Sequence, residues 1–190
     1  MDELNIGLIG AGQMGHEHIQ NFNLLDGARI AAIADTHAPM LAKALELSDT
    51  HARTSDDYET LLSDDSLDAL VIATPNFHHI DVLRAALSTG KPILCEKPLC
   101  TTLADTTEVM QQVARDNLTF QVGMEYRFKP ALAEMIARVE RGDIGKTHML
   151  SIREHRFPFL PKVDDWNRFN ANSGGTLVEK CCHFFDLMRL

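Results

Sequence analysis

The sequence predicts an α/β protein that begins with a doubly wound parallel sheet, and two observations predict it. Short apolar runs alternate along the chain with segments of helical composition, and the first run leads directly into a Gly-rich turn. Strands that alternate with helices of this length form a parallel sheet with helices on both faces. The alternation ends near residue 124, so residues 1–124 are interpreted as one dinucleotide-binding domain.

Each expected strand is a short apolar run, and a helical segment follows each of the first four. The expected strands are 4–9, 28–35, 68–75, 91–98 and 118–124. The expected helices are 13–22, 38–47, a short one at 56–62, 78–90 and 101–117. In the first, Met14, His18 and Phe22 lie at spacings of four; Pro39 lies near the start of the second, and Gly90 closes the helix at 78–90.

Residues 125–190 are expected to begin a second α/β domain. They contain an amphipathic pattern at 129–142, a period-2 alternation at 146–157 that is typical of a strand, and a helical segment at 176–190. This length is marginal for a separate core. We therefore interpret the stretch as the incomplete start of a domain, with a compact appendage on the first domain as the alternative.

Composition narrows the class of protein. A net charge of −9 and a pI near 5.4 disfavour general binding to nucleic acids or anionic membranes. The acidic start lacks the basic region of a signal peptide, and no apolar run approaches the roughly 20 residues that span a bilayer. Four cysteines do not indicate a disulfide framework in a chain of this length. A soluble cytoplasmic protein is the expectation.

The turn at residues 10–15 matches the G-x-G-x-x-G pattern of dinucleotide-binding folds. Gly10 permits the tight turn, Gly12 lets the backbone approach a pyrophosphate, and Gly15 lets helix and strand pack closely. Gln13 and Met14 fill the positions between, at the helix N-terminus where phosphates bind.

Asp35 ends the second strand about 20 residues after Gly15, where an acid accepts the ribose hydroxyls. An acid there repels a 2′-phosphate, so NAD is favoured over NADP. The alternative is a turn with an unrelated surface aspartate.

Two further motifs end strands on the ligand side of the sheet, ATPNFHH after the third long strand and CEKP after the next. The residues expected to meet the cofactor there are Thr74, Pro75, Asn76, His79, Glu96 and Lys97. A solvated charge pair at a strand end is the alternative for Glu96 and Lys97.

With these motifs the chain resembles the Gfo/Idh/MocA oxidoreductases, which include glucose–fructose oxidoreductase and inositol 2-dehydrogenase. The resemblance rests on GLIGAGQMGHEH, ADTH, VIATPNFHH, GKPILCEKP, YRF and GGTLVEKCCHFFD in that order. It implies a Rossmann domain followed by an α/β domain with a large, mostly antiparallel sheet, through which the full-length protein would form a homo-oligomer. Members of the family are longer, which implies a C-terminally truncated chain.

Residues 176–190 sort into two stripes when they are drawn as one helix. Glu179, His183 and Asp186 share one stripe, and the opposite stripe, expected to pack, holds Leu177, Cys181, Phe184 and Met188. Because the cysteines and the histidine diverge, no metal site is expected. A capping box with Thr176 is the alternative for Glu179, and a hydrogen-bonded interior histidine is the alternative for His183.

The resemblance implies a catalytic group of Lys97, Glu179 and His183. Many members read Asp-x-Gly-x-His where this chain has Glu179, Cys181 and His183. The implied activity is NAD-dependent transfer of a hydride from a sugar, inositol or related polyol hydroxyl. His183 would take the proton, Lys97 would stabilise the oxygen or act as the base itself, and Glu179 would orient the pair.

The substrate is expected to meet Tyr126, Arg127, Trp166 and Asp186. Trp166 could stack on a sugar ring, with ordinary packing as the alternative. Arg127, Arg153, Arg156 and Arg168 could bind an acidic sugar, although a solvated strand and loop is the plainer interpretation. An NAD-dependent glycosidase and a non-catalytic dinucleotide sensor are the other functions considered.

Overall fold

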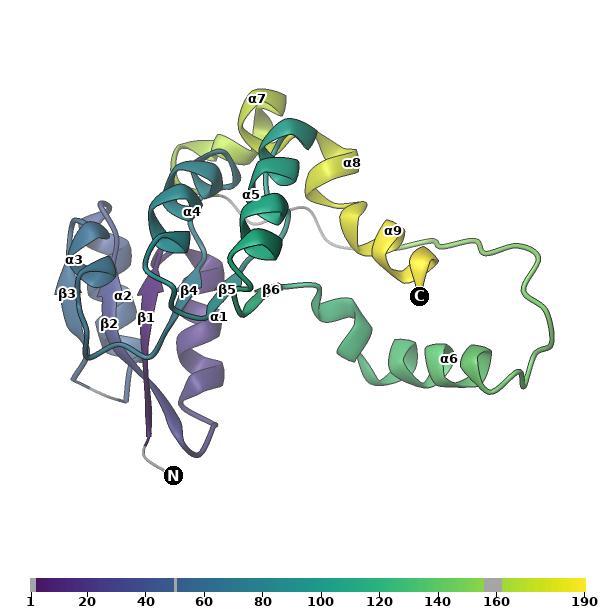
Figure 1. Ribbon diagram of the computed structural model, residues 1–190, viewed down its shortest axis with the longest axis horizontal. Coiled ribbons are helices and arrows are strands. Elements are labelled where there is room, and N and C mark those ends of the chain that lie inside the picture. The colour runs from purple at the N-terminus through teal and green to yellow at the C-terminus, as the bar shows by residue number, and fades with distance from the viewer. Residues whose placement is uncertain (1–2, 50, 156–161) are drawn as a thin grey trace.

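The computed structural model describes residues 3–49, 51–155 and 162–190 (Figure 1). Its centre is a six-stranded, all-parallel sheet in the order β3-β2-β1-β4-β5-β6. This is the strand order of Rossmann folds, so the predicted doubly wound sheet is confirmed. The strands are β1 (Leu4–Ile9), β2 (Ala28–Ala34), β3 (Arg53–Ser55), β4 (Ala69–Ile72), β5 (Ile93–Cys95) and β6 (Phe120–Val122).

The edge strand β3 was missed by the sequence prediction. It consists of Arg53, Thr54 and Ser55, which pair with the end of β2. All three residues are polar, so the sequence has no apolar run here that would indicate a strand. An edge strand also does not need apolar residues on both of its faces. Its position is set by the neighbouring strand rather than by a local pattern.

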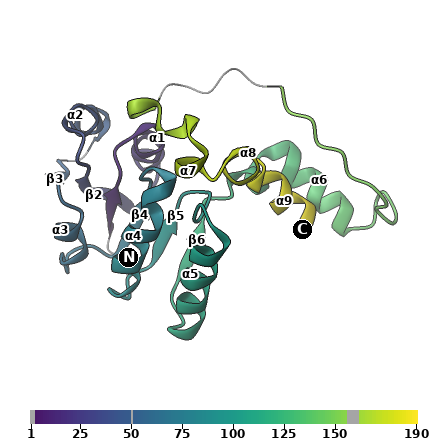
Figure 2. The same cartoon turned by 90° about the horizontal axis from the view of Figure 1, so that it is seen from above.

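Helices cover both faces of the sheet, because successive residues of each strand point to opposite sides. Leu8 packs in a cluster with Ile19 of α1 and Ala44 of α2, whereas Ile9 packs with Leu83 of α4 and other helices of the second face. Figure 2 shows α1 and α2 on one side of the sheet and α3, α4 and α5 on the other. The bounds are α1 (Gln13–Phe22), α2 (Ala38–Leu47), α3 (Glu59–Leu62), α4 (His79–Leu87) and α5 (Leu103–Arg115).

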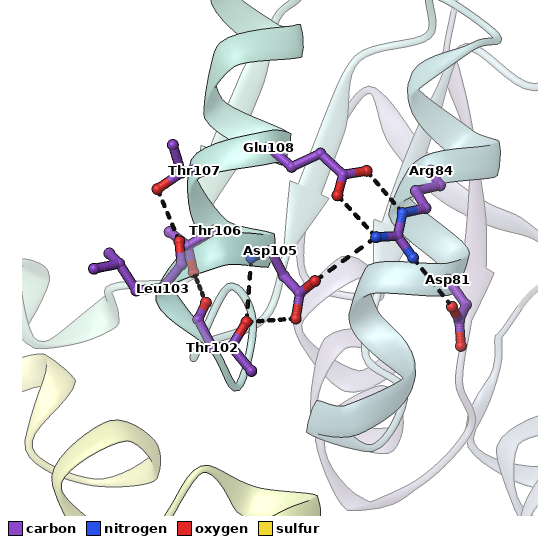
Figure 3. A network of polar contacts seen from close by, with 8 residues as sticks. All are labelled: Asp81, Arg84, Thr102, Leu103, Asp105, Thr106, Thr107 and Glu108. Atoms are coloured by element: carbon purple, nitrogen blue, oxygen red, sulfur yellow. Dashed lines mark hydrogen bonds and ion pairs between the residues drawn. The ribbon is translucent and has the colours of Figure 1, made fainter.

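An ion-pair network joins α4 to α5 (Figure 3). Arg84 donates from Nε and Nη2 to the two carboxylate oxygens of Glu108 at 2.7 and 2.8 Å. Asp81 and Asp105 each lie 3.7 Å from the same guanidinium, and Thr102 caps α5 by accepting from the Asp105 amide at 3.1 Å. The network therefore ties together the helices that follow the ATPNFHH and CEKP motifs.

The regular elements that the structure describes in the second part of the chain are helices. After η2 (Glu125–Phe128), α6 (Pro130–Glu140) extends away from the sheet (Figure 1). The later elements are η3 (Val163–Arg168), α7 (Asn170–Ser173), α8 (Thr176–Glu179) and α9 (Cys182–Arg189). No helix in the described residues is long and apolar enough to cross a bilayer.

The strand expected at 146–157 is not found. Residues 146–155 form no helix or strand and are exposed except for half-buried Ile152, and 156–157 lie outside the described residues. A strand exists only when its backbone pairs with another, and within the described parts of 125–190 no segment offers that pairing. The implied antiparallel sheet is therefore not seen.

The single helix expected at 176–190 is also a wrong prediction. It divides into α8 and α9, with Lys180 and Cys181 between them. His183 and Leu187 are the buried residues of α9, whereas Leu177 is 67% exposed and Met188 is 50% exposed. The chain thus turns the His183 side inward, because that side packs against η2. Of the apolar stripe, Leu177 and Met188 face outward, and Cys181 and Phe184 are half-buried.

Candidate active site

One cavity of about 1450 Å³ lies beyond the carboxyl ends of the strands. It exceeds the roughly 300–1,000 Å³ of ordinary small-molecule pockets. It collects residues from both parts of the chain, and most of the predicted site residues line it: Gly10, Gly12, Gln13, Met14, Asp35, Thr74, Pro75, Asn76, His79, Glu96, Lys97, Tyr126, Trp166, Glu179 and His183. Segments separated by most of the sequence therefore meet at one place.

The Gly-rich turn has two crowded glycines and one open glycine. Gly10 has φ +101°, and a Cβ on it would lie 2.5 Å from the carbonyl carbon of Ala73. A Cβ on Gly15 would overlap the carbonyl oxygen of Gly10. No atom of the described residues lies within 4 Å of a Cβ placed on Gly12. Gly10 and Gly15 thus allow the turn to form, while Gly12 leaves its backbone open.

Asp35 fastens this turn to the end of β2. Its Oδ2 accepts from the Ala11 amide at 2.6 Å, and its Oδ1 accepts from the His37 amide at 2.7 Å. Each carboxylate oxygen retains a second lone pair that can accept from a hydroxyl. The open backbone at Gly12, the helix N-terminus behind it and this acid fit a dinucleotide with free ribose hydroxyls, as NAD has.

The side chain of His79, predicted to contact the cofactor, lines the cavity and is fully buried. Its Nδ1 lies 2.9 Å from the carbonyl oxygen of Pro98, and its Nε2 lies 3.0 Å from that of Thr74. Burial lowers the pKa of His79, although these carbonyl contacts oppose the shift. The ring therefore links the end of β4 to the loop after Lys97.

Glu96 is buried and bonded, which rules out the solvated charge pair. It is 8% exposed, and its Oε1 lies 2.8 Å from Nε2 of His18 on α1. Burial raises the pKa of Glu96, but the His18 hydrogen bond and the charges of His18 and Lys97 outweigh it and leave the pKa lowered. His18 was not predicted as a site residue, although its spacing of four from Met14 and Phe22 places the three on one face of a helix.

Lys97 contacts Glu179 through the backbone. Its Nζ donates to the carbonyl oxygen of Glu179 at 3.2 Å, and the peptide bond between Lys97 and Pro98 is cis. Burial raises the pKa of the Glu179 carboxyl, while Lys97 and Lys162 oppose the shift. Within the described residues no side chain caps the start of α8, so the alternative capping box with Thr176 is not formed.

His183 is the most buried of the three residues expected to form the catalytic group. It is 2% exposed, its ring stacks on Tyr126 with 4.1 Å between centroids, and its Nε2 lies 3.5 Å from Oε1 of Glu125. Its Nδ1 is buried and has no hydrogen-bond partner among the described residues. Burial lowers the pKa of His183 to about 4, and the charges of Lys97, Lys180 and Lys129 add to the effect.

Several lysines at the site were not predicted. Lys180 donates to the Tyr126 hydroxyl at 2.7 Å and pairs with Glu154 at 3.0 Å, and Nζ of Lys129 lies 3.4 Å above the Tyr126 ring. Lys162 also lines the cavity, and its pKa is lowered by burial and by the charge of Lys97. Nothing in their local sequence marks these lysines, because only the path of the chain brings them together.

Two of the predicted substrate residues bind each other. Both guanidinium nitrogens Nε and Nη2 of Arg127 donate to the carboxylate of Asp186, and neither residue is among the described residues that line the cavity. Trp166 does line it, with an edge contact to Phe77 at 6.1 Å.

The arginine cluster considered for an acidic substrate is not assembled in the described chain. Arg153 is exposed, Arg168 pairs with Asp165, and Arg156 lies outside the described residues. The four cysteines are free thiols, and no group of three or more His, Cys, Asp or Glu side chains in the described ranges is arranged to hold a metal ion.

Comparison with known proteins assigns both parts of the chain. Residues 4–124 match a family model described as an oxidoreductase family with an NAD-binding Rossmann fold, in agreement with the predicted cofactor. Residues 136–190 match the model of the family's C-terminal alpha/beta domain.

Curated relatives extend the match along the chain. It is 34% identical over 183 residues to the uncharacterized oxidoreductase YrbE of Bacillus subtilis, covering 96% of this chain and 52% of that protein. It is 30% identical over 186 residues to a myo-inositol 2-dehydrogenase of Thermotoga maritima, covering 98% and 54%. The chain spans about half the length of the curated relatives it matches.

A solved structure agrees with these matches. The myo-inositol dehydrogenase from Lactobacillus casei in complex with NAD(H) and myo-inositol has a TM-score of 0.71 at 29% identity, over 75% of this chain and 43% of that one. By sequence along nearly its whole length, and by fold, the chain belongs to the Gfo/Idh/MocA family of oxidoreductases.

Proposed function

We propose that this chain carries the cofactor site and the catalytic group of an NAD-dependent dehydrogenase that oxidises a hydroxyl of an inositol, a sugar or a related polyol. The observation that carries the proposal is the meeting of Lys97 and His183 in the cavity that the Gly-rich turn also lines. On this proposal residues 1–124 bind the dinucleotide and 125–190 begin the substrate domain. Cytoplasmic location and homo-oligomeric assembly stay predictions.

His183 is the proton acceptor in this proposal. Its low pKa keeps the imidazole neutral near pH 7. Its Nε2 lies 3.5 Å from Oε1 of Glu125, a residue that also lines the cavity. The hydroxyl proton of the substrate moves to the neutral imidazole.

Lys97 stabilises the oxygen as it loses its proton. One hydrogen of its ammonium group is directed to the Glu179 carbonyl, so two remain to donate to the substrate oxygen. Bound NAD supplies the acceptor for the hydride that leaves the adjacent carbon. The Lys97 charge favours the developing alkoxide over the neutral hydroxyl, and this preference lowers the barrier.

The Lys97→Met variant of the full-length protein tests the assignment. NADH formation is measured with inositols, aldoses and sugar acids, with NAD and NADP in parallel, and NAD binding is measured by calorimetry. We expect kcat to fall about 10²–10³-fold while NAD still binds. Lys146→Met, at an exposed lysine away from the cavity, is the matched control.

Near-normal turnover by Lys97→Met would remove Lys97 from the mechanism. Release of nitrophenol from a nitrophenyl glycoside without net NADH would favour the glycosidase instead. NAD binding with no turnover of any substrate would favour the sensor.

A further inference from the structure

The carboxylate of Glu96 connects two parts of the site that are distant in sequence. Its Oε1 accepts from Nε2 of His18 at 2.8 Å, and its Oε2 accepts from the Lys97 amide at 3.1 Å. His18 belongs to α1, the helix that begins at the Gly-rich turn, whereas Lys97 follows β5. The side chains of His18 and Glu96 are only 15% and 10% exposed, so water competes weakly for this contact.

The surrounding backbone leaves the Glu96 carboxylate little freedom to move. A Cβ on Gly123, just after β6, would lie 3.3 Å from three atoms of the carboxyl group. The Glu96 amide donates to the Ile72 carbonyl oxygen at 2.8 Å, which fixes the main chain to the end of β4. With the backbone held and Gly123 on one side, the bonds to His18 and to the Lys97 amide set the direction of the carboxylate, and the His18 bond is the one made by a side chain.

We propose that His18 is a positioning residue that orients Glu96, and through it the backbone of Lys97, against the helix that carries the dinucleotide turn. His18 touches neither Lys97 nor the reacting atoms in this assignment. Its imidazole acts as a neutral or charged Nε2–H donor to an ionised carboxylate, and such charge-assisted bonds are stronger than neutral ones. A test by enzyme activity rests on the proposed function, whereas a test of where Lys97 is placed does not.

The test compares His18→Leu, which removes the donor, with His18→Gln, whose side-chain amide carries a donor at a similar reach. Two readouts are taken on the full-length protein. The first is the rate at which Lys97 reacts with acetic anhydride in the absence of cofactor, followed by mass spectrometry with exposed Lys146 as the internal standard. The second is kcat together with the Kd for NAD. His148→Leu, at an exposed histidine outside the cavity, is the control.

We expect His18→Leu to change the labelling rate of Lys97 and to lower kcat about 10–100-fold with little change in NAD affinity. His18→Gln should restore both readouts most of the way to wild type. Unchanged Lys97 labelling in His18→Leu would overturn the proposal, and so would equal damage in Leu and Gln variants, which would assign His18 to packing alone. If wild-type protein turns over no polyol, the proposed function fails while the labelling result still decides the role of His18.

Discussion

His183 has surroundings that disfavour its charged form. The imidazole belongs to the buried side of α9 and stacks on the Tyr126 ring, and three lysine ammonium groups act on it. Desolvation and like charges both penalise the imidazolium, so the folded-state pKa of about 4 lies below the 6.5 of a solvated histidine. This base is neutral at pH 7 and can accept a proton without first losing one, although the same low pKa makes it a weaker base than a solvated histidine.

This depressed pKa predicts how stability depends on pH. Between about pH 4 and pH 6.5 the unfolded chain holds the His183 proton more tightly than the folded one, so the free energy of unfolding falls as the pH falls through this window and is level above it. The loss amounts to at most about 3 kcal/mol. Urea unfolding from pH 4.5 to 7.5 measures it.

The control for that measurement is a variant in which the titration is absent. His183→Phe keeps an aromatic ring against Tyr126 and should have a flatter profile than wild type. His79, also buried with a lowered pKa, acts in the same direction in both proteins and cancels in the comparison. Equal slopes for wild type and His183→Phe would show that His183 does not titrate as described.

At the scale of elements, the junction of β1 and α1 separates two roles for glycine. The helix packs on the strand so closely that Gly15 meets the Gly10 carbonyl oxygen, whereas Gly12 faces open space. The same short turn therefore contains one position that the fold requires and one that a ligand requires.

Alanine substitutions distinguish these roles. Gly15→Ala should lower the free energy of unfolding by about 1–3 kcal/mol, because the new methyl forces the helix away from the strand. Gly12→Ala should melt like wild type but bind NAD more weakly, because its methyl projects where a pyrophosphate would approach. Thermal melting and calorimetry measure the two effects. A destabilised Gly12→Ala or a wild-type-like Gly15→Ala would contradict the assignment.

At the scale of the whole molecule, the buried core belongs to the sheet and its helices. Nearly all of the fully buried hydrophobic side chains lie between β1 and α5, whereas the described α6 has no buried residue. A helix that buries little apolar surface depends on its intrinsic propensity alone, which is marginal at this length. The C-terminal helices are attached to the first domain through α7, where the carbonyl oxygen of buried Ser173 accepts from the Asn76 side chain at 3.3 Å, and through the bond from Lys97 to the Glu179 carbonyl. In α9, His183 and Leu187 are the buried residues, and this helix packs on η2.

Hydrogen exchange should report this difference. We expect amides of α6 to exchange orders of magnitude faster than those of α5, a helix of similar length that is docked on the sheet through Val109. Exchange followed by mass spectrometry on the 190-residue chain measures it. Equal protection of the two helices would contradict this expectation and mean that α6 is held in place by tertiary contacts.

The sequence by itself determined five of the six strands of the sheet, the helices of residues 1–124 and the dinucleotide turn. Apolar runs such as 4–9 and 68–75, and the glycines at 10, 12 and 15, act through near neighbours in the chain. Local periodicity and backbone freedom are encoded in such short windows, so these predictions hold in the structure. The assignment of Lys97 and His183 to one catalytic group came from the family resemblance and not from any local pattern.

Only the tertiary structure decided which side of residues 176–190 is buried, where Arg127 binds and how Glu96 is held. Helical periodicity identified two stripes but placed Leu177 and Met188 in the interior, where the structure buries His183 instead, because the choice depends on Tyr126 and the partners that η2 presents. The His18–Glu96 bond joins residues that the sequence separates widely. Such contacts depend on the path of the whole backbone and on which groups lose their water, and neither property can be computed from neighbours along the chain.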